Sequence, residues 1–141
     1  MSQSAPRGNP KPKRGEIWGA ILDPVEGSEM GGHTPGDARP VVVLSMPNTG
    51  RPTNRVCVPL TSYQDAHALL RWCVIVAPDA GNGLKRTSTA ETSQIRALDL
   101  SRFDRKWGSV GETELQAIFA ALGAVLGFDV SPEEKLPQSG E

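Results

Sequence analysis

The sequence predicts a mainly β fold that is closed by a single C-terminal helix, as a small antiparallel barrel or a strongly bent sheet. Short runs rich in β-branched residues alternate with Gly- and Pro-rich turns along most of the chain. Only residues 112–126 repeat apolar side chains at the three- and four-residue spacing of a helix. Because no helical pattern stands between the strand-like runs, a doubly wound parallel sheet is not expected.

The expected strands follow from local composition. The first is stopped by Asp23-Pro24, since proline lacks a ladder donor, and the second is dense in valine. The strong strand predictions are 16–22, 40–44, 55–60 and 70–76, and the weaker ones are 88–95 and 105–110. Trp72 is expected in the core.

The predicted helix presents one apolar face to the sheet. Gly111 suits its N-cap, and Gly127 suits the left-handed position after its last turn. The apolar face comprises Leu115, Ile118, Phe119, Leu122, Val125 and Leu126.

Length and composition indicate one folded unit with two tails. The 141 residues suffice for one core, expected over residues 15–128. A basic arm, 1–14, and a tail, 129–141, are rich in proline and polar residues and are expected to be disordered. The net charge of −1 gives no broad positive field, so any contact with nucleic acid must be local.

Localisation and cofactors are indicated by what the sequence does not contain. No apolar run approaches the about 18 residues of a membrane span. Cys57 and Cys73 lie in apolar runs without metal-like spacing, which favours buried thiols in a reducing cytoplasm. No triad order or phosphate-binding loop is visible, so we expect a site without metal or cofactor.

The loop of residues 27–40, GSEMGGHTPGDARP, combines glycines with hydroxyl, carboxylate, imidazole and guanidinium groups. Arg39 directly precedes the valine run, and its planar donor fork suits a phosphate. A structural ion pair with Asp37 or Glu29 is an equally supported interpretation. Glu29 suits proton transfer or holding Arg39, although most loop glutamates are only solvated.

Other polar side chains stand at or near the ends of expected strands. His33 carries an imidazole, the side chain most often used for proton transfer, and Thr61 and Ser62 follow the third strand, where functional hydroxyls are often placed. For the two hydroxyls taken alone, ordinary turn hydrogen bonding is the better-supported interpretation. The polar cluster of residues 92–96 has the donors and acceptors to contact a base or a sugar.

Read in order, four segments resemble the MazF/PemK-like family of toxin endoribonucleases. They are RGEIWGAILDP, VEGSEMGGH with ARPVVVLS, RVCVPLTS and SQIRALDLSRF, and with the closing helix they cover nearly all of residues 15–128. The resemblance implies an SH3-like barrel with a C-terminal helix, similar to the gyrase poison CcdB. It also implies a homodimeric, cytoplasmic toxin of a type II toxin–antitoxin system, restrained by an antitoxin.

The implied activity is that of an mRNA interferase, which cleaves single-stranded RNA at preferred sequences without metal. Attack by the 2′-hydroxyl leaves a 2′,3′-cyclic phosphate and a 5′-hydroxyl. By the resemblance, Arg39 and Thr61 are catalytic. Because arginine is a poor general base, we expect either that Glu29 or His33 assists proton transfer or that Arg39 acts mainly as an electrostatic stabiliser and acid. The implied RNA-binding residues are Ser28, His33, Ser62 and Gln94.

Two departures from the family pattern stand in this sequence. Residues 34–38 are inserted between the glycines and Arg39, and Ser93 stands where the family favours Asp. Two alternatives therefore stay open. One is a non-catalytic relative that binds DNA gyrase as CcdB does. The other is an SH3-like peptide-binding module, which needs an exposed aromatic groove that 5% aromatic content supplies poorly.

Overall fold

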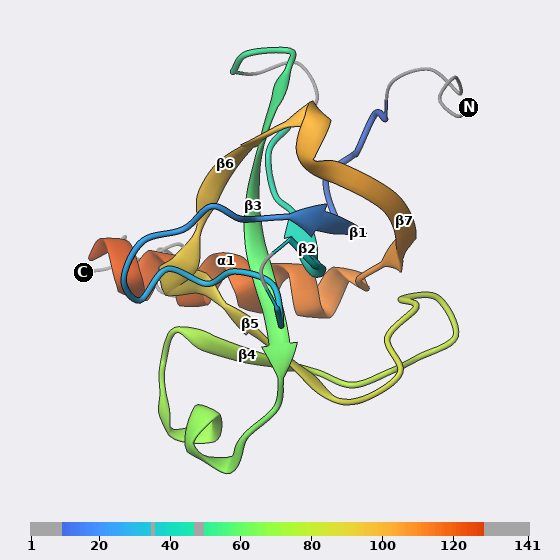
Figure 1. Cartoon of the computed structure of the whole chain (residues 1–141). Coiled ribbons are helices and arrows are strands. Elements are labelled where there is room, and N and C mark those ends of the chain that lie inside the picture. The colour runs from blue at the N-terminus through green and yellow to red at the C-terminus, as the bar shows by residue number, and fades with distance from the viewer. Residues whose placement is uncertain (1–9, 35, 47–49, 129–141) are drawn as a thin grey trace, which may run out of the picture.

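The computed structural model describes residues 10–34, 36–46 and 50–128, which form an antiparallel sheet and one long helix (Figure 1). The strands are β1 (Glu16–Ile21), β2 (Ala38–Val43), β3 (Asn54–Ser62), β4 (Cys73–Val76), β5 (Ser88–Glu91), β6 (Arg96–Asp99) and β7 (Phe103–Ser109). Among the described residues, the short 3-10 helices η2 (Asp65–Leu69), η3 (Thr92–Gln94) and η4 (Leu100–Arg102) precede α1 (Glu112–Leu126). The predicted fold class is confirmed. No helix in the described ranges is long and apolar enough to cross a membrane.

Strand β3 organises the sheet and runs through its middle in Figure 1. Its first half pairs with β6 and β2, whereas Leu60–Ser62 pair with β5. The strand order β4-β5-β3-β2-β1-β7 ends in two strands that do not pair with each other. The architecture is therefore a strongly bent sheet of barrel-like shape, and it is not closed.

Two apolar clusters lie on opposite faces of this sheet, because successive strand residues alternate sides. Val42 and Val58 are cross-strand partners in the cluster that packs against α1, together with the fully buried Ile118. Val41 and Val43 belong to the other cluster, with Leu98 of β6. The sheet is thus held from both sides at β2 and β3, the strands that carry Arg39 and Thr61.

The helix begins and ends where the sequence predicts. Gly111 is its N-cap, and Gly127 follows its last turn with a φ of 84°, a value that glycine adopts without strain. The predicted apolar face is wrong in its last turn, since Val125 and Leu126 are 38% and 56% exposed. The residues that pack on the sheet come from the earlier turns, and Ala121 is buried there.

The middle of the chain differs from the prediction in three places. The strand expected over 70–76 is shorter because η2 and a turn precede β4, and the strand expected over 88–95 stops at Glu91, where η3 begins. Strand β6 was not predicted. Trp72, expected in the core, is 37% exposed because it precedes the edge strand β4.

The two thiols have different surroundings. Cys57 is buried, as predicted, and burial raises its pKa to about 12. Cys73 is only partly buried, contrary to the prediction, and its Sγ lies 3.6 Å from a carboxylate oxygen of Glu91. Burial and this carboxylate raise the pKa of Cys73 to about 11.

The predicted tails lie largely outside the described residues, which exclude 1–9 and 129–141. Residues 10–14 of the expected arm lie against the folded unit. Pro12 is buried, and its carbonyl accepts a hydrogen bond of 2.8 Å from Arg55 Nε. The guanidinium of Arg14 lies 4.4 Å from the ring centroid of Phe119.

Candidate functional site

Arg39 and Thr61 line the same cleft, which has a volume of about 270 Å³. The cleft lies where β2 begins and β3 ends, beside the β4–β5 loop and β7. Its walls are formed by Arg39, Pro40, Leu60, Thr61, Ser62, Leu84, Lys85, Arg86, Ser88 and Trp107. Three of the predicted site residues, Arg39, Thr61 and Ser62, are thus brought together.

The register of the sheet explains why Arg39 meets Thr61. Val41 and Pro59 are antiparallel partners of β2 and β3. Arg39 lies two residues before Val41 and Thr61 two residues after Pro59, which is the same direction in an antiparallel pair, and residues two apart share a face. The bend of β3 toward β5 opens space beside them, since Thr61 pairs there with Thr89.

The guanidinium of Arg39 is fixed by two backbone carbonyls. Its Nη1 donates to Leu60 O at 3.0 Å, and its Nε donates to Gly31 O. These bonds use two of the five guanidinium N–H groups, so Nη2 and one Nη1 hydrogen remain for a ligand. Burial lowers the pKa of Arg39, an effect that the carboxylate of Asp23 opposes.

The predicted ion pair of Arg39 with Asp37 or Glu29 is wrong. Asp37 instead accepts hydrogen bonds from the backbone N–H and the hydroxyl of Thr34, at 3.2 and 2.6 Å. Glu29 accepts from the backbone N–H of Glu26 at 2.8 Å. Both carboxylates stabilise turns of the loop, and within the described ranges Arg39 forms no ion pair with an acidic side chain.

Asp23 anchors the loop that touches Arg39, a role that the sequence did not reveal. Its Oδ2 accepts from the backbone N–H groups of Gly36, at 2.8 Å, and Gly32, at 3.4 Å. A Cβ on Gly31 would lie 2.7 Å from Asp23 Oδ1, so a larger residue there would displace this carboxylate. From the sequence, Asp23 was recognised only as part of the Asp23-Pro24 pair that ends the first expected strand.

Lys85 and Arg86 make the cleft basic, and they too were missed from the sequence. They follow Gly83, which has a φ of 73° and whose added Cβ would lie 2.2 Å from Trp107 O. This close approach, possible only for glycine, brings the β4–β5 loop against β7. With Arg39, three cationic side chains line one cleft of a chain whose net charge is −1.

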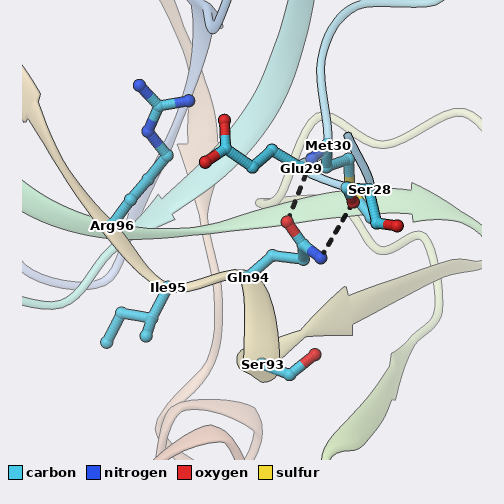
Figure 2. A pocket seen from close by; sticks show the side chains of 7 residues that line it. All are labelled: Ser28, Glu29, Met30, Ser93, Gln94, Ile95 and Arg96. Carbon is cyan, nitrogen blue, oxygen red and sulfur yellow. Dashed lines mark hydrogen bonds between the residues drawn. The ribbon is translucent and has the colours of Figure 1, made fainter. Parts of the chain in front are cut away.

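Ser28, Glu29 and Gln94 lie in a second pocket, of about 480 Å³ (Figure 2). Gln94 connects η3 to the loop between β1 and β2. Its Oε1 accepts from Met30 N–H at 2.9 Å, and its Nε2 donates to Ser28 O at 3.3 Å. The pocket is lined by Ser28, Glu29, Met30, Ser93, Gln94, Ile95 and Arg96. Glu29 therefore does not line the cleft of Arg39, and His33 is exposed and lines neither space.

No group of three or more His, Cys, Asp or Glu side chains in the described part of the chain is arranged to hold a metal ion. The donors that line the cleft are guanidinium, ammonium and hydroxyl groups. Such a set suits an anion, above all a phosphate, to which arginine can donate two parallel hydrogen bonds.

Comparison with known proteins gives consistent matches in sequence and in fold. The model of the family described as PemK-like, MazF-like toxin of type II toxin–antitoxin system matches residues 13–126. Endoribonuclease MazF9 of Mycobacterium tuberculosis is 31% identical over 116 residues, which cover 78% of this chain and 92% of that protein.

Two solved structures share the fold. MazF of Deinococcus radiodurans superposes with a TM-score of 0.69 at 24% identity, covering 85% of this chain and all of that one. A mycobacterial endoribonuclease in complex with its cognate antitoxin gives a TM-score of 0.63 at 20% identity, covering 85% of this chain and 99% of that one.

Proposed function

Because the chain belongs to the PemK-like, MazF-like toxins of type II toxin–antitoxin systems, we propose that it is an endoribonuclease that cleaves single-stranded RNA. The observation that carries the proposal is the meeting of Arg39 and Thr61 in one basic cleft. The alternative of a CcdB-like gyrase poison is not favoured, because the similar proteins are named endoribonucleases. Lys85 and Arg86 add the local positive charge that a polyanion requires.

The proposed reaction is attack of a ribose 2′-hydroxyl on the adjacent phosphorus. The new O–P bond closes a 2′,3′-cyclic phosphate as the 2′-hydroxyl proton passes to water. The bond to the 5′-oxygen breaks, and that oxygen takes up a proton, which Arg39 supplies and regains from water, and leaves as a 5′-hydroxyl. The remaining N–H groups of Arg39 stabilise the charge of the phosphorane, and the Thr61 hydroxyl donates to a non-bridging oxygen. Burial lowers the pKa of Arg39, which favours its donating a proton to the leaving oxygen.

The partners proposed for this toxin come from its family. A mycobacterial relative of the same fold is seen with its cognate antitoxin, and we propose an antitoxin that covers the basic cleft. The family resemblance also supports a homodimer that acts in the cytoplasm as an mRNA interferase with preferred cleavage sequences.

Incubation of the purified protein with a long single-stranded RNA in EDTA tests the proposed function. We expect cleavage at a limited set of sequences, with 2′,3′-cyclic phosphate and 5′-hydroxyl ends, because neither proposed catalytic group requires a metal ion. Intact RNA together with inhibited DNA gyrase would instead support the CcdB-like alternative.

The role of Lys85 and Arg86 is tested through salt dependence. Each single replacement by alanine is expected to weaken binding of a non-cleavable 2′-O-methyl RNA, because one phosphate contact is lost. The slope of log K against log salt concentration should fall by about 0.7 per lost contact on single strands. Arg71→Ala is the matched control, since Arg71 is exposed and lines neither pocket. Unchanged slopes for Lys85→Ala and Arg86→Ala would exclude the proposed contacts.

A further inference from the structure

The second pocket, lined by Glu29 and Gln94, is called here the Glu29 pocket, and the cleft of Arg39 and Thr61 is called the Arg39 cleft. The two adjoin along the loop between β1 and β2. Met30, whose N–H is held by Gln94, directly precedes Gly31, whose carbonyl holds Arg39. Consecutive Cα atoms lie about 3.8 Å apart, less than the length of one nucleotide of an extended RNA strand. A strand whose phosphate lies at Arg39 therefore has a neighbouring nucleotide within reach of the pocket.

The charges in this pocket favour a nucleobase over a phosphate. The carboxylate of Glu29 repels an anion, while Met30 and Ile95 offer apolar surface to a planar ring. Figure 2 shows the carboxylate of Glu29 and the guanidinium of Arg96 extending toward the same side of the pocket. The described residues contain no ion pair between the two groups, so both are available to a ligand.

Each of these two groups keeps free hydrogen-bonding capacity. Glu29 Oε1 accepts from the N–H of Glu26, which leaves Oε2 and the second lone pair of Oε1 free. Arg96 Nη1 donates to Leu22 O at 3.2 Å, which leaves its Nη2 hydrogens free. An acceptor and a donor group thus line the same pocket of about 480 Å³.

Resting on the proposed function, we propose that this pocket binds a guanine of the RNA, within two nucleotides of the cleaved bond. Around the guanine ring, the donors N2–H and N1–H of the Watson–Crick edge are followed by the acceptor O6 and then by N7 of the Hoogsteen edge. Glu29 accepts from the two donors, and Arg96 donates to the two acceptors, the commonest specific arginine contact to a base. No other base presents two adjacent donors beside two adjacent acceptors, so Glu29 determines specificity and does not transfer the proton.

Sequencing of the ends produced from a long RNA by the wild-type protein is the first test. We expect guanine to be enriched at one position within two nucleotides of the cut. Glu29→Gln should reduce that enrichment and leave preferences at other positions intact. The amide keeps an oxygen for the N–H of Glu26, so the loop is retained. Glu26→Gln, in the same loop but outside the pocket, is the matched control and should change nothing.

Inosine, which lacks the N2 amine, tests the contact at atomic level. In a short RNA containing the mapped site, inosine in place of that guanosine should lower kcat/KM of the wild type about tenfold, as expected for loss of one base contact. The same change should have little effect on Glu29→Gln, since its partner is already lost.

The failure of this inference is distinguishable from failure of the proposed function. Cleavage without guanine enrichment, or an inosine effect of equal size in the wild type and Glu29→Gln, would overturn the guanine pocket while the nuclease stands. Absence of any cleavage by the wild type would overturn the proposed function, and the inference with it.

Discussion

Replacement of Arg39 by alanine is expected to lower kcat/KM for a short single-stranded RNA by about a thousandfold, as for loss of one preorganised donor group. The guanidinium is held by the carbonyls of Leu60 and Gly31, so its free N–H groups are aimed before substrate arrives. No other cation in the cleft is positioned by backbone in this way, because Lys85 and Arg86 stand exposed on a loop. The rate of cleavage of a fluorogenic oligonucleotide measures the loss.

A lysine at position 39 separates the effect of charge from that of geometry, and an alanine at a distant arginine serves as the control. Arg39→Lys keeps the positive charge but has no planar fork, so it should recover only a small part of the rate. Arg71→Ala removes an exposed arginine outside the cleft and should be as active as the wild type. Circular dichroism shows whether each variant remains folded. A folded Arg39→Ala protein with the full rate would exclude this cleft as the catalytic site.

Most of the fold could be predicted from local patterns, because the valine-rich runs and the apolar face of α1 are encoded within each segment. The failure near residue 92 has a long-range cause. Thr92 donates to Trp72 O from its backbone N–H, at 3.0 Å, and from its hydroxyl, at 2.6 Å. These bonds accompany the turn from β5 into η3, after which residues 96–99 pair with β3. Nothing in the local sequence shows a partner 20 residues away.

The candidate site could be predicted only in part, for a similar reason. Arg39 and Thr61 were candidates from their places beside expected strands, and their catalytic roles came from the resemblance; the register of β2 and β3 places them together. The polar loop gave no sign that Glu29 faces a different pocket, because Gln94, 64 residues from Met30, holds it there. Lys85 was missed because its place depends on the contact of a distant turn with β7.

Replacement of Asp23 by alanine is expected to lower the turnover number about a hundredfold, the scale of a misplacement by about 1 Å in an active site. Asp23 does not line the cleft and acts through the loop as a positioning residue. Its Oδ2 holds the N–H groups of Gly32 and Gly36, and the carbonyl of the adjacent Gly31 holds Arg39 Nε. Without this anchor the guanidinium loses its fixed direction, while the basic side chains that bind RNA remain.

A loss of turnover without a loss of RNA affinity would identify Asp23 as a positioning residue. Affinity for a non-cleavable 2′-O-methyl RNA should change little in Asp23→Ala, because Lys85 and Arg86 are untouched. Asp23→Asn keeps an oxygen to accept from the loop and loses only the charge that raises the pKa of Arg39, so it should recover most of the rate. Asp104→Asn, an exposed carboxylate on β7 outside the cleft, is the matched control. Equal losses in Asp23→Asn and Asp23→Ala would show that charge, and not the hydrogen bonds to the loop, is what Arg39 requires from Asp23.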